Sequence, residues 1–273
     1  MNIIFRHIVK IGLEIAAREN IKKSDGIVIP DSATQQIACF AHDTITRKIM
    51  LDGVFEKHEL MAVKKLLIDQ RITCDTCLDI GANIGNHTLF FADFFTKVIS
   101  FEPNERPFKL LKFNSSLTDN IQPFNIGLST NTMELPAKLK PLNSGSARIC
   151  DNDESDTFFS VVSLDDFLVD NKHSNISFMK IDVEGHELMV LQGAKSTIIQ
   201  HKPMIALEMH FKKDIKNNVE ILDLLEELGY QQTYILRYRF FGALNYFFKN
   251  MSISEFRNLP IRNYRMVLFE ASK

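Results

Sequence analysis

The chain has 273 residues, of which 45% are hydrophobic, so it can form one large α/β domain with additions around a substantial core. Its 32 Lys and Arg nearly balance its 34 Asp and Glu, and the formal net charge of −2 argues against a general nucleic-acid binder. No apolar stretch reaches the length of a transmembrane segment, and the N-terminal residues lack the pattern of a signal peptide.

Four cysteines are present, and a zinc site would need further Cys or His residues at ligand spacing. Cys77 falls inside a predicted strand, where a small apolar residue suits the core. We therefore expect free thiols and a cytoplasmic location.

The N-terminal residues, 1–72, are predicted to form a cap on a main domain that covers residues 73–273. Apolar residues recur at helical spacing in two places within this cap, and turn residues separate them. The expected elements are an amphipathic helix over 3–17, short strands over 26–30 and 45–51, and a helix over 56–70.

The most informative stretch runs from Thr76 to Gly85 and reads T-C-L-D-I-G-A-N-I-G. Its apolar start is typical of a buried parallel strand over 76–80, and a helix is predicted over 86–95. Gly81 and Gly85 let the backbone approach a ligand closely, and the amides at the start of the helix point outward. A strand, a glycine turn and a helix in this order predict a site for a polar nucleotide-like ligand.

A second strand is predicted over 97–101, and it ends at Glu102. This residue follows Gly81 by 21 positions, where a carboxylate meets the hydroxyls of a ribose in nucleotide-binding folds. Both NAD and S-adenosylmethionine binders share this arrangement. The turn lacks the third glycine of the dinucleotide pattern, because Ile84 and Asn86 stand nearby.

The remaining pattern alternates strands and helices and then ends with two strands that we expect to pair antiparallel. This ending favours the strand order 3-2-1-4-5-7-6, so we predict a Rossmann-like class I methyltransferase fold: a seven-stranded, mostly parallel sheet with a C-terminal antiparallel hairpin. A polar segment over 129–160 is either a functional loop or a hairpin insertion. The other expected strands are 121–126, 158–162, 176–181, 204–207, 233–238 and 264–270, and the other expected helices are 107–116, a short one after Ser163, 187–199 and one ending at Leu228.

Polar residues follow the strand over 176–181 in the sequence K-I-D-V-E-G-H-E. Because they lie at the carboxyl edge of the sheet, we expect Asp182 and Glu184 to face the ligand. Glu187 is expected to cap the next helix. His186 either faces water or is a further candidate for contact with the acceptor, ranked below the others. Glu208-Met-His210 brings a similar group to the end of the next strand, and His210 can take a proton near neutral pH.

Several ordered motifs resemble those of FkbM-type methyltransferases: D-I-G-A-N-I-G, F-E-P, V-V-S-L-D-D-F, K-I-D-V-E-G-H-E, L-Q-G-A and L-E-M-H, together with D-G-V-F-E over 52–56. The resemblance covers about residues 50–210. It implies a class I methyltransferase fold and transfer of a methyl group from S-adenosylmethionine to a hydroxyl of a sugar, glycan or natural product.

The site residues follow from this interpretation. Glu102 is expected to bind the ribose, and Asp182, Glu184 and His210 are the candidates for binding or deprotonating the acceptor. The residues expected to shape the cofactor site are Asp79, Gly81, Ala82, Asn83, Gly85, Asn125 and Ile126.

Alternatives remain at this stage. No metal is assigned, but carboxylates at 182, 184 and 208 are also suitable ligands for Mg²⁺ or Ca²⁺. Two other functions are also compatible with the sequence. One is that of an NAD-dependent oxidoreductase or epimerase, and the other is that of a partner protein that binds the cofactor without turnover. After Thr233, seven cations accompany only Glu255 and Glu270, which indicates either an anionic acceptor or a solvated face. The sequence also leaves a homo-oligomer open.

Overall fold

The computed structural model describes most of the chain from residue 36 onward. The elements expected over 3–17 and 26–30 lie outside the described residues. The described residues are 36–41, 43–139, 147–150, 152–170, 175–212, 214–239 and 245–272.

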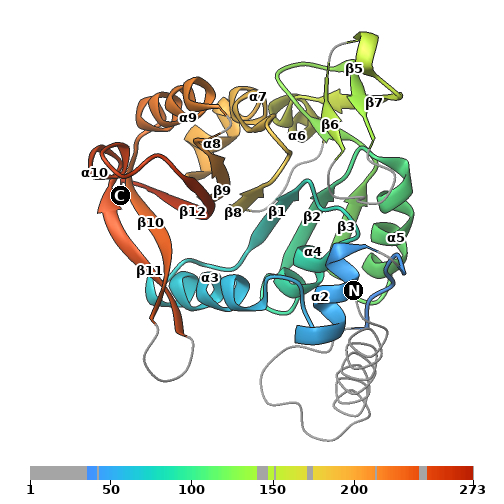
Figure 1. Cartoon of the computed structure of the whole chain (residues 1–273), viewed down its shortest axis with the longest axis horizontal. Coiled ribbons are helices and arrows are strands. Elements are labelled where there is room, and N and C mark those ends of the chain that lie inside the picture. Colours follow the sequence, from blue (N-terminus) through green and yellow to red (C-terminus); the bar gives the residue numbers. More distant parts are fainter. Residues whose placement is uncertain are drawn as a thin grey trace, which may run out of the picture.

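An eight-stranded sheet forms the centre of the fold, in the order β11-β10-β12-β9-β8-β1-β2-β3 (Figure 1). The five strands from β9 to β3 pair in parallel, whereas β12 is antiparallel to both β9 and β10. The strands are β1 Thr76–Ile80, β2 Lys97–Phe101, β3 Ile121–Phe124, β8 Ile176–Ile181, β9 Met204–His210, β10 Tyr230–Arg239, β11 Asn245–Ser252 and β12 Asn263–Ala271.

Helices cover both faces of this sheet (Figure 1). On one face, Leu60 and Phe91 pack with the strand residue Phe178 in one apolar cluster, and on the other Leu188 and Ile221 pack in a second cluster. Successive strand residues alternate between the two clusters, as the pleat requires. The first face carries α3 Lys57–Asp69, α4 Asn86–Ala92 and α5 Glu105–Ser115, and the second carries α6 Leu164–Asp170, α7 Glu187–Gln192, α8 Lys195–His201 and α9 Ile215–Glu227.

The strand predicted over 45–51 is wrong, because these residues belong to helix α2, Thr44–Asp52. The side chain of Asp43 accepts a hydrogen bond from the amide of Ile45 and so caps the helix. Thr46 and Ile49 are buried while the residues between them are exposed, which is a helical and not an alternating pattern.

Two further predictions need correction. The helix expected over 187–199 is divided into α7 and α8 at Gly193, where an added Cβ would lie 1.9 Å from the carbonyl oxygen of Ser129. The sheet has eight strands and not seven, because the connection expected before Pro260 contains β11 and the short helix α10, Ile253–Arg257. The strand order 3-2-1-4-5-7-6 holds within the larger sheet, with β11 outside β10.

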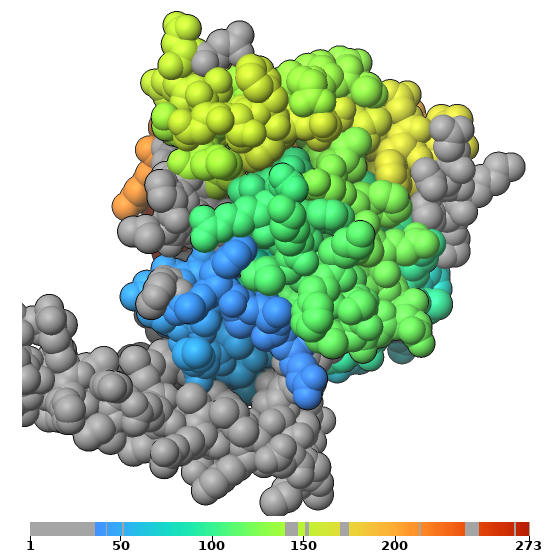
Figure 2. All heavy atoms as spheres, turned by 90° about the vertical axis from the view of Figure 1, so that its right-hand side faces the viewer, coloured from blue at the N-terminus to red at the C-terminus, as the bar shows by residue number. Residues whose placement is uncertain are grey.

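The polar segment over 129–160 belongs to an insertion, residues 127–162, which contains a second, four-stranded sheet in the order β4-β7-β5-β6. Figure 2 shows this insertion, in yellow-green, above the green surface of the domain, with α2 in blue below it. Among the described residues, no helix is long and apolar enough to cross a membrane. The strands of the insertion are β4 Gly127–Leu128, β5 Met133–Lys138, β6 Arg148–Ile149 and β7 Thr157–Val162.

Candidate active site

The glycine turn after β1 lies against the loop after β8. Gly81 has a φ of 77°, and a Cβ added there would lie 1.9 Å from the carbonyl oxygen of Asp182. Gly85 has a φ of 91° and begins α4, and a Cβ added to it would lie 2.8 Å from Leu111. Gly81 requires glycine, because its φ is positive and the added Cβ would collide with the backbone of Asp182. At Gly85 a side chain would need the Leu111 side chain to move.

Glu102 directly follows β2 and faces this turn. One carboxylate oxygen accepts a hydrogen bond of 2.9 Å from the amide of Asn83, and the other accepts one of 2.8 Å from the amide of Asn104. Burial raises the pKa of Glu102 to about 7, although the two backbone hydrogen bonds lower it. The predicted position of this carboxylate beside the glycine turn is therefore what the structure shows.

A buried ion pair lies beneath the turn. The ammonium of Lys180 lies 3.0 Å from Asp79, donates a hydrogen bond of 3.0 Å to the carbonyl of Gly81, and lies 3.7 Å from Asp182. Thr88 donates a 2.6 Å hydrogen bond to the second oxygen of Asp79. Burial lowers the pKa of Lys180, but the two carboxylates raise it by more, so this lysine stays charged.

The loop after β8 is held by its own residues. Glu187 accepts hydrogen bonds of 3.2 Å from the amides of Val183 and Gly185, which agrees with the structural role expected for it. Glu184 adopts a left-handed φ of 53° at the cavity. His186 does not simply face water: its Nε2 lies 2.9 Å from the hydroxyl of Ser129, and burial lowers its pKa.

These elements surround a cavity of about 280 Å³ at the carboxyl ends of the strands. This is the edge at which open α/β sheets bind ligands. One part of its wall is apolar and comes partly from the insertion, and the other part is polar. The apolar residues include Phe101, Leu128, Ile149, Phe159 and Val161, and the polar residues include Glu56, Asn83, His87, Glu102, Lys180, Asp182, Glu184 and Glu208.

The predicted site residues divide into two groups. Those that line the cavity are Gly81, Ala82, Asn83, Glu102, Asp182 and Glu184. The others, which are not among the lining residues, are Asp79, Gly85, Asn125, Ile126 and His210.

The second group lies behind or beside the cavity wall. Asp79 is fully buried below the wall as the partner of Lys180. The side-chain amide of Asn125 donates hydrogen bonds to the backbone carbonyls of Glu102 and Pro103, so it supports the chain just after β2. His210 lies 3.3 Å from Glu208, which lines the cavity.

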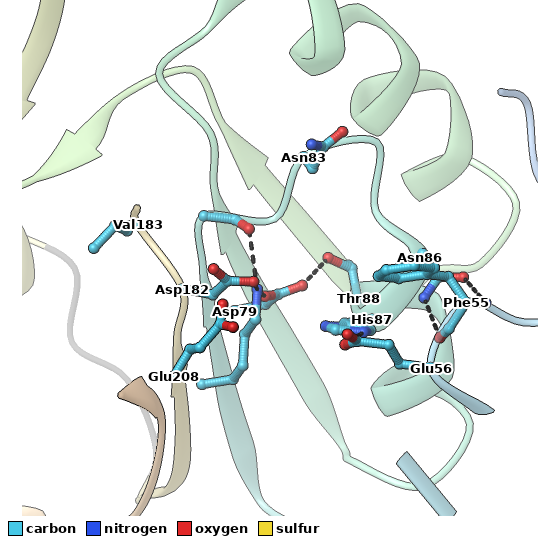
Figure 3. Close-up of polar contacts among 12 residues, drawn as sticks. Phe55, Glu56, Asp79, Asn83, Asn86, His87, Thr88, Asp182, Val183 and Glu208 are labelled. Carbon is cyan, nitrogen blue, oxygen red and sulfur yellow. Dashed lines mark hydrogen bonds and ion pairs between the residues drawn. The ribbon is translucent and has the colours of Figure 1, made fainter. Parts of the chain in front are cut away.

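Sequence reasoning assigned no role to Glu56, His87 or Lys180, all of which line the cavity, and named Glu208 only as an alternative metal ligand. Burial, followed by the charge of Asp182 and other acids, raises the pKa of Glu208 to about 8. Figure 3 shows Asp79, Asp182 and Glu208 gathered together, with Glu56 and His87 beside one another on the side of Phe55 and Asn86. The motif D-G-V-F-E was the one sequence signal that pointed to Glu56.

Metal binding by the residues at 182, 184 and 208 stays an open alternative. Within the part of the chain that the structure describes, no group of three or more His, Cys, Asp or Glu side chains is arranged to hold a metal ion. Four of the seven C-terminal cations have described side chains, and none of the four is among the residues that line the cavity: Arg237, Lys249, Arg257 and Arg262. One of them, Arg257, pairs with Asp223 and Glu226 on α9.

The sheet order and the glycine turn facing an acidic residue define a Rossmann-like class I methyltransferase fold. Comparison of the sequence with protein families agrees: the family profile of the methyltransferase FkbM domain matches residues 79–231, more than half of the chain. The chain belongs to the FkbM methyltransferase family.

The individual proteins and solved structures that are similar to this chain share less than a third of its residues over the matched regions. The hexuronic acid methyltransferase AglP of Haloferax volcanii is 29% identical over 163 residues, which are 59% of this chain and 66% of AglP, just under two thirds of its length. An FkbM methyltransferase structure from Methylobacillus flagellatus is 20% identical, with a TM-score of 0.43, over 71% of this chain and 43% of that chain. An O-methyltransferase from Bacillus cereus in complex with SAH is 12% identical, with a TM-score of 0.46, over 95% of this chain and all of that chain.

Gly81→Ala should destabilise the protein by more than about 3 kcal/mol, because the new Cβ would need the Asp182 backbone to move and φ is positive. Gly185→Ala is a matched control: its φ of 104° is also positive, but nothing lies within 4 Å of the new Cβ. We expect a cost of only about 1–2 kcal/mol there. Urea unfolding of both variants measures the difference, and equal losses would contradict the close approach.

Glu102 should make stability depend on pH. A Glu in the unfolded chain ionises near a pKa of about 4.3, whereas the pKa of Glu102 in the fold is about 7. Between these values the folded protein holds a proton that the unfolded chain has released, so the free energy of unfolding falls as pH rises, by on the order of 3 kcal/mol. In Glu102→Gln, which has no ionisable group at this position, the free energy of unfolding should not show this decrease with pH. Unfolding from about pH 4.5 to about pH 7.5 tests it, and identical slopes for both proteins would refute it.

Proposed function

We propose that the protein is an S-adenosylmethionine-dependent O-methyltransferase that transfers a methyl group to a hydroxyl of a sugar, glycan or natural product. The observation that carries this proposal is one cavity that joins the glycine turn and Glu102 to the carboxylates of Asp182 and Glu208. Membership of the FkbM family supports methyl transfer, and the hexuronic acid named for AglP supports a sugar acceptor.

The residues at the turn fit this methyl donor. The side-chain oxygen of Asn83 is buried at the cavity and has no hydrogen-bond partner in the part of the chain that the structure describes, so it is available to a ligand. Glu102 presents a carboxylate where ribose hydroxyls bind in such folds, and the apolar wall near Leu128 and Phe159 suits a nucleobase. When bound, S-adenosylmethionine supplies an electrophilic methyl group on a sulfonium.

The chain's own residues then have two tasks: they hold the acceptor oxygen in line with the methyl group, and they take the proton of the hydroxyl. Asp182 and Glu184 line the cavity beside the turn and can perform these tasks. Glu208, with His210 behind it, is a third group at this end. Its raised pKa of about 8 brings its proton exchange close to neutral pH, which suits acid–base work.

Family membership favours this function over an NAD-dependent oxidoreductase. The cofactor-binding partner without turnover is separated by experiment. Purified protein, S-adenosylmethionine and a glycan extract should release S-adenosylhomocysteine and add about 14 daltons to an acceptor. Cofactor binding without any release would favour the partner protein.

Asp182→Asn should lower the rate of methyl transfer by about 10²-fold or more and leave binding of S-adenosylhomocysteine nearly unchanged, because the lost carboxylate acts on the acceptor. Asp166→Asn is the control, since this residue lies in α6 and is not among the lining residues of the cavity. Calorimetry and S-adenosylhomocysteine release measure the two effects. A fully active Asp182→Asn enzyme would refute the role of this residue.

A further inference from the structure

The cavity has a small side lobe between β8 and β9. The lobe has a volume of about 30 Å³, enough for one or two atoms the size of a water or hydroxyl oxygen. It shares five lining residues with the main cavity, so the two spaces have a common wall. These five are Glu56, His87, Lys180, Asp182 and Glu208.

Glu56 is held at this lobe by a strained backbone. Its φ is 57°, in the left-handed region that a residue with a long side chain rarely adopts. The preceding residue, Phe55, exchanges two hydrogen bonds of 3.0 Å with the side chain of Asn86, which fixes the segment to the start of α4. The carbonyl of Glu56 also accepts a 3.0 Å hydrogen bond from the amide of Leu60. Several hydrogen bonds therefore fix the backbone of Glu56 at the lobe.

His87 lies directly beside Glu56. Its Nε2 is 3.3 Å from a carboxylate oxygen of Glu56, and the residue is 7% exposed. Its ring stacks on Phe55 at 6.3 Å with an interplanar angle of 21°. Nε2 is buried at the lobe and, apart from this contact with Glu56, has no hydrogen-bond partner among the described residues. The imidazole is thus placed to orient Glu56 and to meet a polar group that enters the lobe (Figure 3).

The charges around the lobe are unbalanced. The carboxylates of Glu56, Asp182 and Glu208 line it, and the one fixed cation among its described lining residues is Lys180. That ammonium is already committed to Asp79 and to the carbonyl of Gly81, each at 3.0 Å. The raised pKa of Glu208, which Glu56 and Asp182 both increase, reflects the same negative surroundings. A ligand that brings a further negative charge into the lobe would therefore be repelled.

We propose that this lobe is the acceptor subsite and that Glu56, positioned by His87, accepts a hydrogen bond from a hydroxyl of an uncharged sugar. The proposal rests on the proposed function and names its substrate class. The sugar ring occupies the main cavity, and one hydroxyl enters the lobe between Glu56 and Glu208. The acceptor therefore differs from the hexuronic acid named for AglP, because the negative charge of the lobe excludes a carboxylate next to that hydroxyl. His87 is a positioning residue, since it acts through Glu56.

Binding of small sugars to the full-length protein tests the proposal without knowledge of the natural acceptor. The probes are the methyl glycosides of glucose, galactose and mannose, and methyl glucuronoside, measured by saturation-transfer NMR with and without S-adenosylhomocysteine. We expect at least one neutral glycoside to bind and the glucuronoside to bind more weakly. Glu56→Gln should weaken neutral-sugar binding about tenfold to a hundredfold, the usual scale for a hydrogen bond to a charged group.

Matched variants separate positioning from folding. His87→Gln keeps a donor near Nε2 and should retain most of the sugar affinity, whereas His87→Leu should lose it. Glu220→Gln changes an exposed carboxylate on α9 that pairs with Lys216 and should have no effect. Binding of S-adenosylhomocysteine should equal that of the wild type in these three variants and in Glu56→Gln. This result would show that the methyl-donor half of the cavity is intact.

Several results would overturn the proposal: no neutral glycoside binds, the glucuronoside binds best, Glu56→Gln binds as wild type does, or the two His87 variants behave alike. The proposed function fails separately. If sugars bind as expected but no S-adenosylhomocysteine is ever released from S-adenosylmethionine, the subsite stands and methyl transfer does not.

Discussion

The buried pair of Lys180 and Asp79 is the constraint on which the site depends. The two residues are register partners in adjacent parallel strands, so the ion pair joins the end of β8 to the end of β1. The same ammonium binds the carbonyl of Gly81 and thereby fixes the start of the glycine turn. Loss of either partner would leave a buried charge uncompensated, which costs about 3–5 kcal/mol in proteins. The ion pair and this hydrogen bond therefore join the glycine turn and the end of β8 into one unit.

This unit accounts for the polarity of the cavity. Glu102 approaches the turn from β2, and Asp182 approaches it from β8, so acids face the ligand space from two sides. Lys180 offsets one buried charge, while the raised pKa values of Glu102 and Glu208 show how the other two respond to burial. The insertion adds the apolar wall through Ile149, Phe159 and Val161. A nucleoside and a hydroxylated acceptor need these two kinds of wall.

Much of this could be predicted from local patterns. The glycine turn, the acid after the second strand and the carboxylates of K-I-D-V-E-G-H-E all follow buried strands directly, and parallel strands bring their carboxyl ends to one edge. The features that the sequence did not predict depend on contacts between residues that are far apart in the chain or on burial in the folded protein. His210 is the last residue of β9 and lies 3.3 Å from Glu208, but it is not among the residues that line the cavity, so its role stays a prediction. Residues 45–51 carry β-branched side chains, but the cap from Asp43 and burial of Thr46 and Ile49 make them a helix. Glu56 enters the site because Asn86, thirty-one residues from Phe55, binds the backbone beside it.

The most direct test of the central claim is calorimetric titration of the protein with S-adenosylmethionine. Wild-type protein should bind it. Glu102→Ala, checked for folding by circular dichroism, should bind it at least about tenfold more weakly, because the variant lacks the carboxylate that we propose binds the ribose. Equal affinity for the two proteins, or binding of NAD in place of S-adenosylmethionine, would contradict the account.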